Sequence, residues 1–189
     1  VAARSAAKLD AAGLGSATRV SLDATDENAL RDFFGSRPAF DHVVISAGSG
    51  GRGLVTEQKP ADAAAAFEGK FWAYYRLART VKIVPGGSLT SVSGVIGQKP
   101  APGAALISAI NAAVEGLTRG LAVDFAPTRV NTVCPGMIDT PMWDRMPRPD
   151  RDAMYAHVAA ELPVGHIGQP ADVAAAILFL MTHPFATGM

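Results

Sequence analysis

The 189-residue chain has a single cysteine, no excess of either charge and no long, strongly apolar run. One thiol, Cys134, cannot build an intramolecular disulfide framework or a cysteine-rich zinc site, and it fits a reducing compartment. The 17 basic and 17 acidic side chains balance, which argues against binding to a phosphate backbone. The apolar run at 174–181 is too short to span a bilayer, and no signal-like segment opens the chain. We therefore expect a cytoplasmic protein without nucleic-acid or membrane partners.

The composition is that of a folded domain. Hydrophobic residues make up 49% of the chain and charged residues 18%, a balance that excludes a disordered segment. A chain of this length usually forms one domain and buries about 70% of its unfolded surface. The chain opens on Val1 without a methionine and stops at Met189, so we expect it to be a piece of a longer protein.

Short strand-like segments alternate with helical patterns. Strands are predicted at 18–23, 42–46, 88–93 and 129–134, and helices at 26–34, 61–82, 104–125, 149–162 and 170–181. The Pro-Gly-Gly sequence at 85–87 is expected to separate a helix from the next strand, and residues 135–151, with four prolines, to form a flap. Strands alternating with helices predict an α/β protein with a doubly wound, Rossmann-like parallel sheet in a single domain.

Ligands bind outside the carboxyl ends of the strands in such sheets. This rule selects five segments, at 4–5, 23–24, 46–53, 91–97 and 135–140.

These segments, in this order, resemble the short-chain dehydrogenase/reductase family. The strongest likeness is at 112–143, where a helix, a Val-Asn-x-Val strand and a Pro-Gly-x-Ile-x-Thr turn follow one another. Residues 162–174 and 185–188 resemble the later parts of the family pattern. The resemblance implies a nicotinamide cofactor, a small-molecule substrate, and a homodimer or homotetramer. It also implies that the first strand, with its Gly-rich turn, precedes Val1 and that the last strand follows Met189.

The resemblance places Arg4 and Ser5 at the end of the family's second strand. Members that prefer NAD carry an acid there, whereas this chain has Ala3 followed by Arg4. A guanidinium can hold a 2′-phosphate in a bidentate fashion, so we interpret the cofactor as NADP, with NAD less favoured. The alternative is a solvated surface arginine at the start of a helix.

Two further segments are assigned to the adenosine side. Asp23 and Ala24 resemble the turn that contacts adenine; the alternative is a helix N-cap, which Thr25 or Asp26 could also supply. Ser46, Ala47 and Gly48 resemble the family's Asn-Ala-Gly segment beside the ribose. The glycines at 48, 50 and 53 also spell Gly-x-Gly-x-x-Gly, but no helix follows directly, as a phosphate-binding fingerprint requires.

The turn at 135–140 is assigned to the nicotinamide side. By resemblance, main-chain groups of Ile138 pair with the carboxamide and the hydroxyl of Thr140 lies nearby. Pro135 and Gly136 shape this turn. The alternative is an ordinary turn that ends a strand.

The catalytic positions depart from the family pattern. The family uses a Tyr general acid/base, a Lys four residues later, a Ser that orients the carbonyl and an Asn on an earlier helix. Alignment places Ile107 at the Tyr position, Asn111 at the Lys position, Gly94 at the Ser position and Lys70 at the Asn position. Ile107 has no proton to give, so the family's standard mechanism cannot run from that position.

Lys and Asn therefore look exchanged. A partly buried lysine can have a lowered pKa and act as an acid/base, which makes Lys70 a candidate replacement proton donor. Ser93 is the candidate carbonyl-orienting hydroxyl, and Asn111 could bond a ribose hydroxyl. The alternatives are a snorkelling helix lysine and a strand-end serine satisfied by the backbone. No metal is expected, because the four histidines lack ligand spacing.

Two functions remain open. The first is an NADP-dependent oxidoreductase with a non-standard active site that acts on a carbonyl or an alcohol. The second is a catalytically inactive dinucleotide-binding pseudoenzyme or oligomer partner. A Rossmann-like methyltransferase is disfavoured, because it would need an acid at the ribose position. The flap carries Met142, Trp143 and Met146, which suggests an apolar substrate.

Overall fold

The computed structural model describes residues 1–48 and 50–189, and its five strands form two parallel sheets. Strand β1 (Ala2–Ala3) pairs with β2 (Val20–Ser21). Strands β3 (Phe40–Ile45), β4 (Ile83–Val92) and β5 (Arg129–Val133) pair in the order β3-β4-β5. Parallel strands that alternate with helices confirm the predicted Rossmann-like α/β architecture. Ser49, within the predicted Gly-rich segment, lies outside the described residues.

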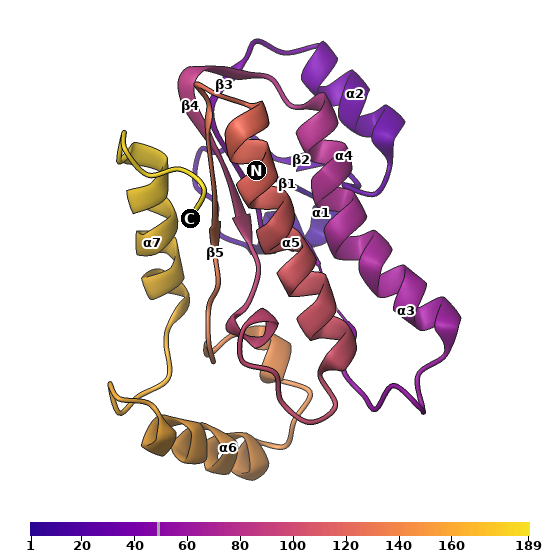
Figure 1. Cartoon of the computed structure of the whole chain (residues 1–189), viewed down its shortest axis with the longest axis vertical. Helices are drawn as coiled ribbons and strands as arrows, with labels where there is room; N and C mark the ends of the chain where they lie inside the picture. The colour runs from indigo at the N-terminus through magenta and orange to yellow at the C-terminus, as the bar shows by residue number, and fades with distance from the viewer. Residues whose placement is uncertain (49) are drawn as a thin grey trace.

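Helices cover both faces of the three-stranded sheet. In Figure 1, α4 and α5 lie on one side of the strands and α7 on the other. The helices are α1 (Ala6–Ala11), α2 (Glu27–Gly35), α3 (Pro60–Phe67), α4 (Ala73–Thr80), α5 (Ala105–Asp124), α6 (Arg148–Glu161) and α7 (Pro170–Thr182). The core contains Leu89 and Val130 from the sheet together with Leu30, Tyr74 and Val114 from the helices.

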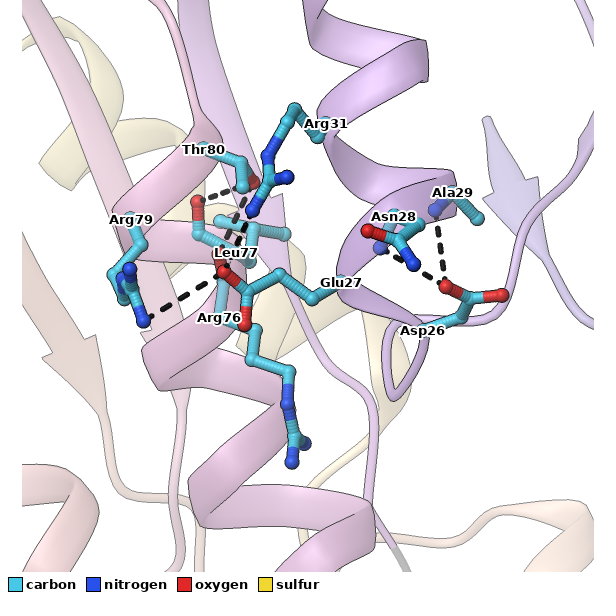
Figure 2. A network of polar contacts seen from close by, with 9 residues as sticks. All are labelled: Asp26, Glu27, Asn28, Ala29, Arg31, Arg76, Leu77, Arg79 and Thr80. Atoms are coloured by element: carbon cyan, nitrogen blue, oxygen red, sulfur yellow. Dashed lines mark hydrogen bonds and ion pairs between the residues drawn. The ribbon is translucent and has the colours of Figure 1, made fainter.

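Helix α2 is capped at its start and tied to α4 by charge. Oδ1 of Asp26 accepts hydrogen bonds from the backbone N–H groups of Asn28 and Ala29, both at 3.0 Å, so Asp26 is the N-cap. Oε1 of Glu27 lies 3.2 Å from Arg31 and 3.6 Å from Arg79 of α4 (Figure 2). This pairing links α2 to α4, the helix that follows Lys70 in the chain.

The predicted separation of helix and strand at 85–87 is wrong. Strand β4 begins at Ile83 and runs through the Pro-Gly-Gly sequence. The pairing with β3 shifts there, from Phe40 opposite Ile83 to His42 opposite Ser88, so the extra residues form a bulge. A Cβ on Gly87 would collide with the carbonyl oxygen of Asp41, which explains the glycine.

The predicted helix at 61–82 is interrupted. Between α3 and α4 the chain makes a π-helical segment at Glu68–Trp72, and Lys70 lies within it. Such segments occur often at functional sites, and they leave no signature in residue spacing. Helix α1 was not predicted from the sequence; it is short, and the hydroxyl of Ser5 caps its first turn by accepting from the N–H of Lys8 at 3.3 Å.

Helix α5 confirms the predicted long apolar helix. By length and apolar composition alone it could cross a membrane, a property that core helices share, and 33% of this stretch is buried. Ile110 and Val114 are buried, and the helix packs against β5. Its buried face also carries the polar residues Asn111, Glu115 and Thr118, of which the first two belong to the candidate site.

Candidate functional site

The cleft of about 810 Å³ between the two sheets lies where the doubly wound strand order places a further strand, so only the strand-end residues around it bear on a ligand site. It brings together six of the residues assigned to the cofactor, from the ends of β1, β2 and β3. These are Arg4, Asp23, Ala24, Ser46, Ala47 and Gly48. Leu22, Leu30 and Val44 supply apolar lining. The rule that ligand sites follow the carboxyl ends of strands therefore selected segments that are adjacent in space.

Opposite charges face this cleft. Asp23 accepts from the backbone N–H of Thr25 at 2.9 Å and from its hydroxyl at 2.8 Å. These two hydrogen bonds, together with the charge of Arg4, lower the pKa of the Asp23 carboxyl, although partial burial opposes them. The backbone of Arg4 is fixed by the hydroxyl of Ser21, which donates to its carbonyl at 3.3 Å. Ser5 lies beyond the lining and serves as the α1 cap.

Lys70 and Asn111 are in direct contact. The ammonium Nζ of Lys70 donates to Oδ1 of Asn111 at 2.8 Å and to the carbonyl oxygen of Ser93 at 3.1 Å. Asn111 is only 2% exposed, so this contact is fixed within the interior. Burial lowers the pKa of Lys70, and the nearby Cys134 opposes this effect. The two residues that alignment marks as exchanged thus form one hydrogen-bonded unit.

Gly48 joins the cleft to this unit. Its φ is +132°, a conformation that side chains rarely adopt, and an added Cβ would lie 2.7–2.8 Å from three carbons of the Lys70 side chain. The lysine stem therefore packs directly on the Gly48 backbone, at the end of the segment that lines the cleft.

Ser93 holds the unit from the strand side. Its hydroxyl donates to the carbonyl oxygen of Asn111 at 3.1 Å and to Glu115 at 3.4 Å. Gln98 donates to the other oxygen of Glu115 at 2.9 Å. The hydroxyl is thus engaged with α5, while the Ser93 carbonyl binds Lys70. Sequence reasoning missed Glu115 and Gln98; the available signal was a carboxylate on the core-facing side of an apolar helix.

The glycine at the family's Ser position makes room for Asn111. A Cβ added to Gly94 would lie 2.8 Å from Nδ2 of Asn111, which donates to the Gly94 carbonyl at 3.4 Å. The departures at 70, 94 and 111 are therefore sterically consistent with one another.

A Gly94→Ser variant, which restores the family's hydroxyl, should destabilise the protein by about 1–3 kcal/mol through overpacking. The measurement is urea unfolding of Gly94→Ser, Asn111→Ala and the double variant. The cost should shrink in the Asn111→Ala background, where the colliding amide is gone. Strictly additive costs would show that Asn111 is not the obstacle.

The turn assigned to the nicotinamide side lies beyond the lining of the cleft. Ile138 bridges to Gly168, and its carbonyl accepts from the indole N–H of Trp143 at 3.1 Å. The carbonyl of Thr140 accepts from the backbone N–H of Trp143 at 3.1 Å, and that of Pro135 accepts from Val95 at 2.9 Å. Gly136 follows within the same turn. Trp143, in the middle of the predicted flap, thus fixes the flap to its own first turn at 135–140.

Comparison with known proteins identifies the class. Residues 2–188 match a family model described as enoyl-(acyl carrier protein) reductase. The chain therefore belongs to the short-chain dehydrogenase/reductase family.

Individual relatives agree with this assignment. A short-chain dehydrogenase/reductase of Stachybotrys chlorohalonatus is 35% identical over 156 residues, which cover 78% of this chain and 60% of that protein. The cyclic-di-GMP-binding biofilm dispersal mediator protein of Escherichia coli is 33% identical, over 87% of this chain and 69% of that protein. A small-chain dehydrogenase solved with NADPH superimposes with a TM-score of 0.84 at 33% identity, covering 99% of this chain and 92% of that one.

The length of the match varies among these relatives. The chain matches 41% of the length of the carbonyl reductase family member 4 of Danio rerio, so it spans only part of several curated relatives.

Proposed function

We propose that the protein catalyses NADP-dependent hydride transfer to or from a carbonyl or alcohol, with Lys70 in place of the family's tyrosine as the acid/base. The observation that carries this proposal is the contact of Lys70 Nζ with Asn111 Oδ1 at 2.8 Å, within a half-buried site that adjoins the cleft through Gly48.

The donor set in the cleft fits the adenosine half of a dinucleotide. Arg4 offers a guanidinium for a 2′-phosphate, and the ionised carboxylate of Asp23 can accept from an adenine amino group. The absence of an acid at position 3 removes the group that would repel that phosphate. The NADPH complex of a 33% identical relative supports the same choice. When bound, the cofactor would supply the hydride.

Lys70 handles the proton in this mechanism. Hydride addition to a carbonyl leaves an alkoxide that must be protonated. Two N–H groups of Lys70 are held by Asn111 and by the Ser93 carbonyl, which leaves the third free to donate. The lowered pKa makes that proton easier to release. We assign Asn111 and Ser93 to orienting this amine; for Ser93 to orient the substrate carbonyl, its hydroxyl would have to rotate away from Asn111.

The cofactor assignment is tested at Arg4. Arg4→Ala in the full-length protein should weaken NADPH binding about 10- to 100-fold, because a charge-assisted hydrogen bond contributes about 1.5–3 kcal/mol. NADH binding should change little. The measurement is a fluorescence titration with each cofactor, and Arg148→Ala on the exposed face of α6 serves as the control. If the wild-type protein binds neither cofactor, hydride transfer is excluded and a scaffold role remains.

The proposal also covers the substrate class and the oligomeric state. Met142 is 70% exposed beside the turn at 135–140, which favours a small apolar substrate beneath the flap. Trp72 and Tyr75 are exposed on the π-helical segment and α4, and their rings stack edge to face at 5.6 Å. Aromatic side chains of this kind are common in interfaces, which supports a homodimer or homotetramer.

A further inference from the structure

The amine of Lys70 is held by neutral groups alone. Its two hydrogen-bond acceptors are an amide oxygen and a backbone carbonyl. Across residues 1–48 and 50–189, none of the ion pairs includes Lys70. The buried carboxylate of this network, Glu115, is bonded to Gln98 and Ser93 instead. The ammonium form therefore lacks the opposite charge that usually stabilises a half-buried lysine.

The same contacts suit a neutral amine. A primary amine has two N–H bonds and one lone pair, so the two acceptors engage both hydrogens and leave the lone pair free. Burial lowers the pKa of Lys70, which enlarges the neutral fraction at a given pH. The other titratable group near Lys70 is Cys134, and burial together with Glu115 raises the pKa of its thiol. Cys134 is therefore uncharged near neutral pH, and its charge opposes the lowering of the Lys70 pKa only where the thiol ionises.

Lys70 is not fully enclosed. It is half-buried and lies next to the cleft, which Gly69 and Gly48 line although Lys70 itself does not. Neither glycine has a side chain that could cover the lysine. A desolvated, accessible amine without a charge partner is the form in which lysine attacks carbonyl carbons.

We propose that Lys70 captures small aldehydes covalently as a Schiff base, an activity that needs no bound cofactor. The lone pair of Nζ forms a bond to the carbonyl carbon and gives a carbinolamine. Loss of water then leaves the C=N bond, with one aldehyde consumed and one water released. This reactivity goes beyond hydride transfer and does not depend on it.

The test is trapping with propanal and sodium cyanoborohydride at pH 7 in the absence of cofactor, in the full-length protein. Cyanoborohydride reduces the imine to a stable secondary amine, and peptide mass spectrometry then gives the rate of modification at each lysine. An ordinary lysine with a pKa near 10.4 is neutral in only about 0.04% of molecules at pH 7. We expect Lys70 to react at least about tenfold faster than Lys8, Lys59, Lys82 or Lys99, because burial lowers its pKa and so enlarges its neutral fraction.

A charge placed beside the amine provides the matched control. Asn111→Asp puts a carboxylate where Lys70 now has a neutral acceptor, so trapping at Lys70 should fall about tenfold or more while Lys99 is unaffected. If that variant does not fold, the pH dependence of the wild type replaces it, and trapping at Lys70 should level off at a lower pH than at Lys99. A wild-type rate at Lys70 no faster than at the exposed lysines would overturn the proposal. That result would leave the cofactor titrations untouched, so the two proposals can fail separately.

Discussion

Replacing Lys70 by methionine should reduce turnover about 10²- to 10⁴-fold, the range in which a general acid contributes to rate. Methionine keeps an unbranched apolar stem that can pack on Gly48, so NADPH binding should change little, but the Tm should fall because the Asn111 amide oxygen and the Ser93 carbonyl lose their donor. The measurement is kcat with a panel of small carbonyl substrates, together with a cofactor titration. Lys99→Met, at an exposed lysine, is the matched control.

The pH profile separates a chemical role from a packing role. In the reductive direction the ammonium is the active form, so the rate should fall as pH rises through the lowered pKa of Lys70. In the oxidative direction the neutral amine is the active form, so the rate should rise over the same range. Both limbs should vanish in Lys70→Met. A variant that keeps full turnover with an unchanged profile would remove Lys70 from the mechanism.

Substituting Gly48 by alanine should destabilise the protein by about 3 kcal/mol and abolish most of its activity. Two costs combine. A backbone with positive φ costs a non-glycine residue about 1–2 kcal/mol, and overpacking costs about 1–3 kcal/mol. The new methyl group would lie 2.7–2.8 Å from carbons of the Lys70 side chain. That side chain cannot easily move away, because its amine makes two hydrogen bonds. The measurements are the free energy of unfolding and kcat.

Gly13→Ala isolates the backbone cost. Gly13 also has a positive φ, +60°, but an added Cβ there meets nothing within 4 Å. It should therefore show only the backbone cost, about 1 kcal/mol, with activity unchanged. Equal losses in the two variants would mean that contact with Lys70 is not what requires glycine at position 48.

The sequence predicted the architecture well because strand and helix patterns alternate clearly. The apolar helix at 104–125 and the strand at 129–134 appear within a residue or two of their predicted bounds. The prediction failed where tertiary contacts override local signals. Pro85 and Gly87 are breakers on any local scale, yet they lie inside β4 because a bulge accommodates them.

The candidate site was predictable in part. Strand ends located the cleft, and alignment located Lys70 and Asn111, but only the folded structure shows that Nζ of Lys70 lies 2.8 Å from Oδ1 of Asn111. Alignment could not show that Gly94 is left without a side chain to admit Asn111. Nor could it assign the Ser93 hydroxyl to α5, since a serine at a strand end has several partners within reach.

The π-helical segment at Glu68–Trp72 also determines which face α4 turns towards the core relative to α3. Each helical residue advances the chain by about 100°, so one surplus residue in a wide turn rotates the next helix by that angle. A helical wheel drawn continuously from 60 to 80 therefore assigns the wrong faces on one side of the segment. Deleting a single residue there would straighten the ladder of backbone bonds, yet it would turn α3 about its axis relative to α4. We therefore expect alignments of relatives to place insertions and deletions in this helix at 68–72, where a wide turn can accommodate one extra residue.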